Sequence, residues 1–159
     1  MIQRELYLKR LRPFYSSELI KVITGVRRCG KSTLLKQIAR ELADQGVAPD
    51  HILFINFEDY AYKDLNDPDR FHAFVEQWFP LEGKTYLLFD EIQNVKDFEL
   101  VVNSLRATRD VSIFLTGSNS KLLSGELSTQ LGGRTVSFTM MPFTFKEFCT
   151  FKGQEVSQD

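Results

Sequence analysis

A phosphate-binding loop is the strongest chemical signal in this sequence. Residues 25–32 read GVRRCGKS and fit the pattern G-x-x-x-x-G-K-[ST] at every fixed position. An apolar run precedes the loop and a helix-forming segment follows it, so backbone N–H groups and the positive end of that helix would face a phosphate. In this chemistry Lys31 reaches the terminal phosphates and Ser32 ligates Mg²⁺. The predicted nucleotide-binding residues are Gly25, Val26, Arg27, Arg28, Cys29, Gly30, Lys31, Ser32 and Thr33.

Two acidic residues follow a second apolar run. Residues 85–89 end directly in Asp90 and Glu91. Phosphoryl transfer needs charge neutralisation and a positioned nucleophile. We therefore assign Asp90 to the hydration shell of Mg²⁺ and Glu91 to orienting and deprotonating the attacking water. The alternative is that this acidic pair caps the next helix.

Two further polar residues lie where predicted strands end. Ser118 follows a strand and could sense the γ-phosphate or hold the water, whereas the alternative is an ordinary turn. Asn56 interrupts an apolar strand, and it could hydrogen-bond Glu91 and hold it inactive until a partner binds. A satisfied core amide is the equal alternative.

Hydrophobic periodicity places these residues on alternating strands and helices. One expected strand leads into residue 25, and the others cover 51–57, 85–89, 111–115 and 134–140. The strand at 51–57 is apolar almost throughout, and the strand at 134–140 alternates as an edge strand does. One expected helix begins at Asp67-Pro68, and a stripe of apolar residues on this helix should face the core of the protein. That stripe comprises Phe71, Phe74, Val75, Trp78 and Phe79. A capping box at Thr144 predicts a last helix. The alternation indicates a parallel sheet that binds ligands at the carboxyl ends of its strands.

Composition narrows the class of protein. A chain of 159 residues with 20 Lys and Arg against 21 Asp and Glu fits one domain without a nucleic-acid or membrane signal in its bulk charge. Cys29 and Cys149 lie far apart, which indicates reduced thiols and a cytoplasmic setting. Within its cationic loop, Cys29 is either a reactive thiolate or a small filler residue. The basic residues of segment 1–19 form a solvated face or contact the nucleotide base; they are Arg4, Lys9, Arg10 and Arg12.

Several segments together resemble one family. They are the loop with its helix start at 25–35, Ile55-Asn-Phe-Glu58, Leu88-Phe-Asp-Glu-Ile-Gln93, residues 116–127, Gly133-Arg134 and residues 141–148. The combination is similar to prokaryotic AAA+-type ATPases in which an N-terminal P-loop domain precedes a C-terminal nuclease-like domain.

The resemblance implies a three-layer α-β-α P-loop NTPase fold of the ASCE type, with strand order 5-1-4-3-2. It also implies ATP and Mg²⁺ as ligands, Ser118 as a sensor and Arg134 as an arginine finger in a homo-oligomer. The ATPase domain would cover residues 1–159, with an N-terminal segment at 1–19, a nucleotide-binding core at 20–141 and the start of a connection to a lid and C-terminal domain at 142–159. We expect residues 1–159 alone to bind nucleotide weakly and hydrolyse it poorly.

Other functions fit the residues less well. A small-metabolite kinase would need an acceptor pocket, and the consecutive Asp90-Glu91 favours water activation. A GTPase would need an N-K-x-D motif and a D-x-x-G spacing after the strand, neither of which the sequence has. A P-loop module that binds nucleotide without significant hydrolysis, recruited for a nucleic-acid or protein target, is the remaining alternative, although the charge does not support such a target.

Overall fold

A central parallel sheet organises the molecule. The computed structural model describes residues 5–26, 29–118, 122 and 125–141. Its strands are β1 (Ile20–Gly25), β2 (Ile52–Asn56), β3 (Thr85–Asp90), β4 (Val111–Ser118) and β5 (Thr135–Met140). All neighbouring strands pair in parallel, in the order β2-β3-β4-β1-β5. This is the order that the family resemblance implies, and it confirms the predicted fold class.

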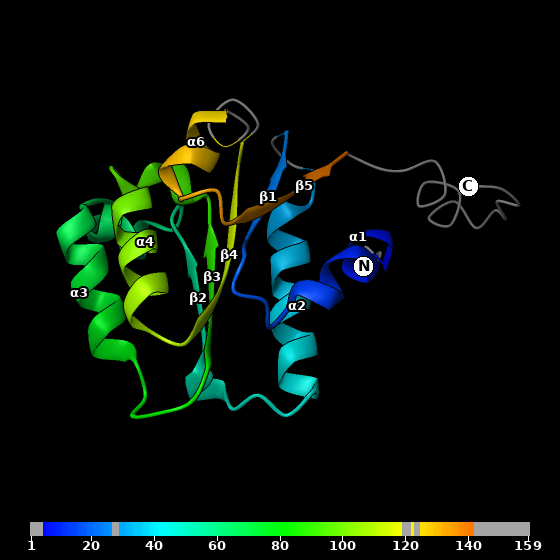
Figure 1. The fold of residues 1–159 in the computed structure, drawn as a ribbon, viewed down its shortest axis with the longest axis horizontal. Helices are drawn as coiled ribbons and strands as arrows, with labels where there is room; N and C mark the ends of the chain where they lie inside the picture. Colours follow the sequence, from blue (N-terminus) through cyan, green and yellow to red (C-terminus); the bar gives the residue numbers. More distant parts are fainter. Residues whose placement is uncertain (1–4, 27–28, 119–121, 123–124, 142–159) are drawn as a thin grey trace, which may run out of the picture.

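Helices cover the sheet as two outer layers (Figure 1). The α-helices are α1 (Glu5–Leu11), α2 (Lys31–Asp44), α3 (Pro68–Trp78), α4 (Phe98–Thr108) and α6 (Gly125–Gln130). Short 3₁₀ turns are η1 (Arg12–Phe14), η2 (Pro49–His51), η3 (Tyr60–Asn66) and η4 (Ile92–Asn94). Figure 1 shows α1 and α2 on one side of the strands and α3 and α4 on the other. The predicted helix at Thr144 lies outside the described residues, as does the rest of 142–159.

Local sequence explains where the helices begin and end. Asp67 caps α3 by accepting the N–H of Arg70 at 3.0 Å, and Pro68 occupies the first helical position, as predicted. Gly46 follows α2 with a φ of 100°, a conformation that glycine adopts without a steric penalty. The cap therefore fixes where α3 begins, and the glycine fixes where α2 ends. The apolar stripes of these helices then pack on the sheet.

Two predictions of burial need correction. The apolar run at 51–57 indicated a strand covered on both faces; Leu53 and Ile55 are buried on one face, but Ile52 and Phe54 on the other are only partly buried, since β2 lies at the sheet edge. In the aromatic stripe of α3, Phe71 and Val75 are in the core, whereas Phe74 is 37% exposed. An apolar residue is free to remain at the surface, so periodicity alone overstates how many stripe residues reach the core.

The basic N-terminal segment is tied to the domain rather than merely solvated. Arg12 donates to both carboxylate oxygens of Glu41 on α2, at 3.0 and 2.7 Å, and also pairs with Glu5. Tyr15 adds a hydrogen bond to Glu41 at 2.8 Å. The Arg12 hydrogen bonds are the main cause of the lowered pKa of Glu41, and Tyr15 lowers it further. The prediction of a solvated face is therefore wrong for Arg12, while Lys9 and Arg10 are exposed.

A lysine is fully buried in the middle of the sheet. Lys21 on β1 donates to the carbonyl of Ser17 and to the hydroxyl of Ser112, both at 2.8 Å. Its nitrogen lies 4.8 Å from the centre of the Phe114 ring. The pKa of Lys21 is lowered to about 7, mainly by burial and to a smaller extent by the charge of Lys84.

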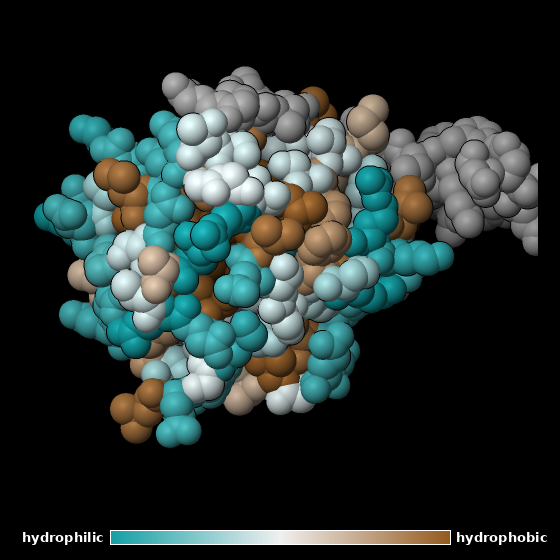
Figure 2. Space-filling model, viewed as in Figure 1, coloured by the Kyte–Doolittle hydropathy of each residue, from teal (hydrophilic) through white to brown (hydrophobic). Residues whose placement is uncertain are grey.

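The visible surface is largely hydrophilic. Figure 2 shows polar residues over most of the α3 and α4 side, with apolar residues in small groups nearer the strands. Within the described parts of the chain, no helix combines the length and apolar character needed to span a membrane.

Candidate functional site

The carboxyl ends of β1, β2 and β3 meet around one polar pocket. Its cavity volume is about 320 Å³. The lining residues are Gly30, Lys31, Ser32, Thr33, Asn56, Glu58, Asp90 and Glu91. The structure thus brings together the loop and the acidic pair that the sequence analysis assigned to one site, and it adds Glu58, to which no role had been assigned.

The second half of the loop starts α2. Gly30 has a φ of 100° and is the N-cap of this helix, whose first residue is Lys31. The side-chain nitrogen of Lys31 donates to the carbonyls of Gly25 and Val26, at 2.9 and 3.1 Å. Lys31 is only 4% exposed, because its side chain folds back over its own loop. Arg27 and Arg28 lie outside the described residues.

Cys29 supports the loop by packing. It is 1% exposed and belongs to the apolar cluster on the α2 side of the sheet. A Cβ atom added to Gly25 would overlap the Cys29 sulfur and also meet the carbonyl of Met140. Both the glycine and the small thiol are therefore needed for this close approach, and the burial of Cys29 favours the filler interpretation over the reactive thiolate.

A threonine from β4 organises the acidic pair. The hydroxyl of Thr116 donates to Oδ1 of Asp90 and accepts the backbone N–H of Glu91 at 2.9 Å. Both Asp90 and Thr116 are buried. One hydroxyl thus fixes the carboxylate of Asp90 and the backbone of Glu91 together. Thr116 was not among the residues predicted from sequence, and its signal was its place at the end of a strand that neighbours β3.

Glu91 has an unusual backbone conformation. Its φ of 57° and ψ of 50° lie in the left-handed region, which non-glycine residues rarely adopt. Oε1 of its side chain accepts a hydrogen bond from the amide of Gln93 at 2.7 Å, and Oε2 lies 4.0 Å from the nitrogen of Lys31. Glu91 makes no side-chain cap to η4, and the N-cap of α4 is Asp97. Glu91 is thus the N-cap residue of η4 by position, but its carboxylate caps neither η4 nor α4.

Asn56 and Ser118 lie at the ends of their strands, as predicted. Asn56 is in register with Asp90, but its amide oxygen accepts the N–H of Glu58 at 2.9 Å. Among the described residues no hydrogen bond joins the amide nitrogen of Asn56 to Glu91. Ser118 is in register with Gly25, so it flanks the start of the phosphate loop. Its neighbour Asn119 lies outside the described residues.

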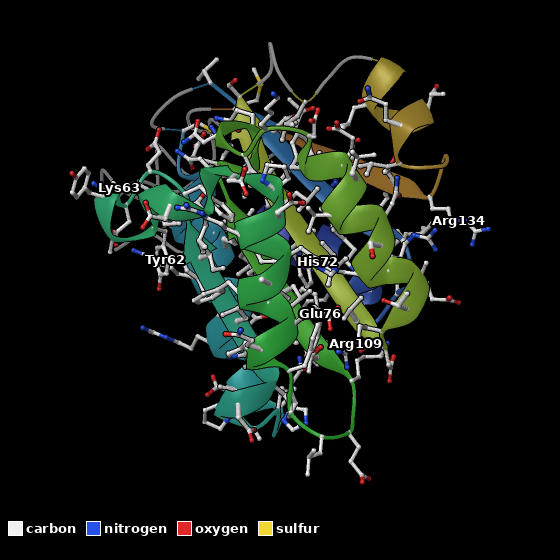
Figure 3. All side chains as sticks on the ribbon, turned by 90° about the vertical axis from the view of Figure 1, so that its left-hand side faces the viewer. Tyr62, Lys63, His72, Glu76, Arg109 and Arg134 are labelled. Carbon is white, nitrogen blue, oxygen red and sulfur yellow. The ribbon has the colours of Figure 1, made fainter. Side chains whose placement is uncertain are left out.

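Arg134 is remote from this pocket within one chain. It directly precedes β5, whose first residue pairs with the first residue of β1 at the amino end of the sheet. Its backbone carbonyl accepts the N–H of Ile20 at 2.8 Å, and the residue is exposed. Figure 3 shows its side chain projecting outward at the margin of the molecule. Lys31 begins at the opposite end of β1, so Arg134 cannot reach a phosphate held by its own loop.

The donor set fits a magnesium ion that is shared with phosphates. Ser32 and Asp90 present a hydroxyl and a carboxylate to the same pocket, and Mg²⁺ prefers such oxygen ligands while keeping several waters. Among the described residues, no group of three or more His, Cys, Asp or Glu side chains could hold a metal by itself. This pattern matches an ion held by one or two protein oxygens together with a bound nucleotide.

A family model and two relatives of known sequence match most of this chain. The family model described as "AAA domain" matches residues 17–149. An uncharacterized protein of Haemophilus influenzae is 46% identical over 149 residues, covering 93% of this chain and 37% of that protein. An uncharacterized protein of Methanocaldococcus jannaschii is 37% identical over 139 residues, covering 87% of this chain and 30% of that protein. The chain therefore spans about a third of the length of these curated relatives.

Solved structures show the same fold at low sequence identity. The replication initiator DnaA bound to AMPPCP and single-stranded DNA has a TM-score of 0.59 and 17% identity, covering 98% of this chain and 53% of that chain. The Aeropyrum pernix ORC2 protein in ADPNP-ADP complexes has a TM-score of 0.56 and 13% identity, covering 92% of this chain and 48% of that chain.

Proposed function

Because this chain belongs to the AAA domain family, we propose that it binds ATP with Mg²⁺ and hydrolyses it, as a motor or switch for a larger protein. One observation carries the proposal. Lys31, Ser32, Asp90 and Glu91 line a single pocket at the carboxyl end of the sheet. These four residues supply a phosphate ligand, two oxygens for a metal ion and a base, which together are the parts that nucleotide hydrolysis requires.

Nucleotide binding would use the N-terminus of α2 and the side chain of Lys31. The first N–H groups of a helix lack partners within the helix and attract phosphate. Lys31 would exchange its hydrogen bonds to the carbonyls of Gly25 and Val26 for bonds to phosphate oxygens. Because it already lies over the loop, this exchange needs only a rotation of its side chain.

Hydrolysis would use the fixed acidic pair. Bound Mg²⁺ neutralises charge on the phosphates. Asp90, held by Thr116, would orient waters of the ion's shell, and Glu91 would accept the proton of the attacking water. The Oε2 atom of Glu91 already faces the nitrogen of Lys31, where terminal phosphates would lie.

Arg134 would act on a neighbouring subunit. Its exposed position at the amino end of β5 excludes a role at its own phosphate loop, but it suits presentation to a second copy of the chain. We therefore propose a homo-oligomer in which Arg134 completes the adjacent site. A guanidinium supplied in this way stabilises the charge of the transition state.

Phosphate release tests the proposal. The full-length protein with ATP and Mg²⁺, and no other acceptor, should release inorganic phosphate, and chelation of the metal should stop it. A non-hydrolysing module would bind ATP without release, whereas a kinase would form phosphorylated product only with an added metabolite. GTP in place of ATP should give slower release, since the sequence has no guanine-reading motif.

A further inference from the structure

Gln93 contacts the proposed base and is not accounted for by the phosphate loop or the acidic pair. It lies in η4, two residues after Glu91, and its side-chain amide donates to Oε1 of Glu91 at 2.7 Å. The hydrogen bond is partly buried, so it competes less with water than a surface contact does.

The rest of the Gln93 side chain is wedged against β4. A Cβ atom added to Gly117 would overlap Oε1 of Gln93, which shows how closely the amide approaches this strand. That oxygen is buried and has no hydrogen-bond partner among the residues that the structure describes. Turning the amide over would place its oxygen against the Glu91 carboxylate and bury the N–H₂ group, so the observed orientation is the favourable one.

Both carboxylate oxygens of Glu91 are therefore engaged in different ways. Oε1 is held by Gln93, while Oε2 faces Lys31 at 4.0 Å. When Lys31 turns to a nucleotide phosphate, its attraction for Oε2 is redirected, but the Gln93 contact is unaffected. The carboxylate would then keep its rotation, with Oε2 exposed toward the phosphate site.

We propose that Gln93 is a positioning residue for Glu91, holding one carboxylate oxygen so that the other faces the water at the terminal phosphate. This inference rests on the proposed function, because it assigns Glu91 the role of base. Gln93 touches neither nucleotide nor water in this account and acts through Glu91 alone.

Replacement by methionine tests the role in catalysis. Gln93→Met keeps the unbranched shape and removes the donor. In the full-length protein we expect kcat to fall about ten- to hundredfold, the usual loss when a supporting contact to a reacting group is removed, with the KM for ATP and the ATP affinity unchanged. Gln77→Met, the same change at an exposed position on α3, should leave kcat as in the wild type.

A double-mutant cycle separates positioning from packing. In a Glu91→Gln background the further change Gln93→Met should leave the residual rate unaltered, since a positioning residue has nothing left to position. An equal loss in both backgrounds would overturn the inference in favour of a packing role.

A paired exchange tests the contact without any need for activity. Gln93→Glu alone puts two carboxylates together and should destabilise the fold in denaturant titrations, whereas Glu91→Gln with Gln93→Glu restores a donor and an acceptor and should regain that stability. No recovery would overturn the contact. If hydrolysis depends on Lys31 and Glu91 but is unchanged by Gln93→Met, this inference alone is overturned. If the wild-type protein does not hydrolyse ATP, the proposed function and the inference are overturned together.

Discussion

The side-chain nitrogen of Lys31 lies 4.0 Å from Oε2 of Glu91, across the pocket that separates the first turn of α2 from the end of β3. The proposed phosphate ligand and the proposed base thus face each other directly. A nucleotide whose terminal phosphate entered between them would bind the Lys31 side chain. The water that attacks this phosphate would then lie beside the Glu91 carboxylate. The resting pair therefore marks the position that the reaction would occupy.

Lys31→Ala should weaken ATP binding about ten- to hundredfold, because a charged hydrogen bond contributes roughly 1.5–3 kcal/mol. Isothermal titration calorimetry with Mg²⁺ measures the change directly. Lys36→Ala, at an exposed position on the same helix, is the matched control and should bind normally. Unaltered affinity in Lys31→Ala would show that the loop does not hold the phosphates.

Glu91→Gln should retain ATP but slow its hydrolysis by roughly two to four orders of magnitude, the usual contribution of a positioned base. Single-turnover phosphate release with pre-bound nucleotide measures the chemical step apart from binding. Glu82→Gln, at an exposed position just before the opposite end of β3, serves as the control. Full activity in Glu91→Gln would mean that another group activates the water.

Thr116→Val should destabilise the domain by about 1–3 kcal/mol, because it leaves the buried Asp90 carboxylate and the Glu91 N–H without their shared partner. Denaturant unfolding of both forms gives the difference. Thr85→Val makes the same change at a buried hydroxyl without a hydrogen-bond partner in the described part of the chain, so it should be neutral or stabilising. Equal losses in the two variants would contradict a special role for Thr116.

The buried Lys21 should make the free energy of unfolding depend on pH in the neutral to alkaline range. Its pKa is about 7 in the folded protein and near the ordinary 10.5 when unfolded. Between these values the unfolded chain binds a proton that the folded chain lacks, so the free energy of unfolding rises with pH, by up to about 1.4 kcal/mol per unit. Below pH 7 both forms are protonated and this contribution stops changing.

Lys21→Met should flatten that slope between pH 7.5 and 10. Urea titrations at a series of pH values measure it, and Lys36→Met controls for loss of an exposed lysine. If Lys21→Met and the wild type show parallel curves, Lys21 keeps its ordinary pKa inside the fold.

Arg134→Ala should slow hydrolysis by about three to five orders of magnitude if its guanidinium reaches a neighbouring site. Mixing full-length Arg134→Ala subunits with Lys31→Ala subunits tests action between subunits, since some interfaces then combine an intact loop with an intact Arg134. Activity should reappear in the mixture at intermediate ratios. Failure to recover at every ratio would argue for a surface role.

The parts of the site with fixed spacing could be predicted from sequence, and the parts that depend on strand pairing could not. The loop at 25–32 and the pair Asp90-Glu91 are continuous in the chain, so their geometry follows from local structure. Thr116 lies 26 residues beyond Asp90, and the two meet only because β3 and β4 are adjacent in a particular register. Nothing in the spacing of residues 90 and 116 indicates that register.

Contacts formed in the fold, one local and one long-range, decide two alternatives that the sequence left open. For Asn56 a bond to Glu91 and a satisfied amide were equal alternatives, and in the structure its oxygen accepts a backbone N–H two residues away, as asparagine side chains often do in turns. Arg12 was expected to be solvated, yet it meets Glu41 across 29 residues because η1 packs beside α2. In both cases the residue type was informative, and the partner was decided by geometry.

The left-handed backbone of Glu91 would set stability against the catalytic role proposed for its side chain. A glycine there would relieve roughly 1–2 kcal/mol of steric cost while deleting the carboxylate. A library of variants selected only for survival at high temperature should thus enrich glycine at residue 91, and one selected for turnover should exclude it. The residue that each selection leaves at position 91 would therefore show whether stability or turnover had been selected.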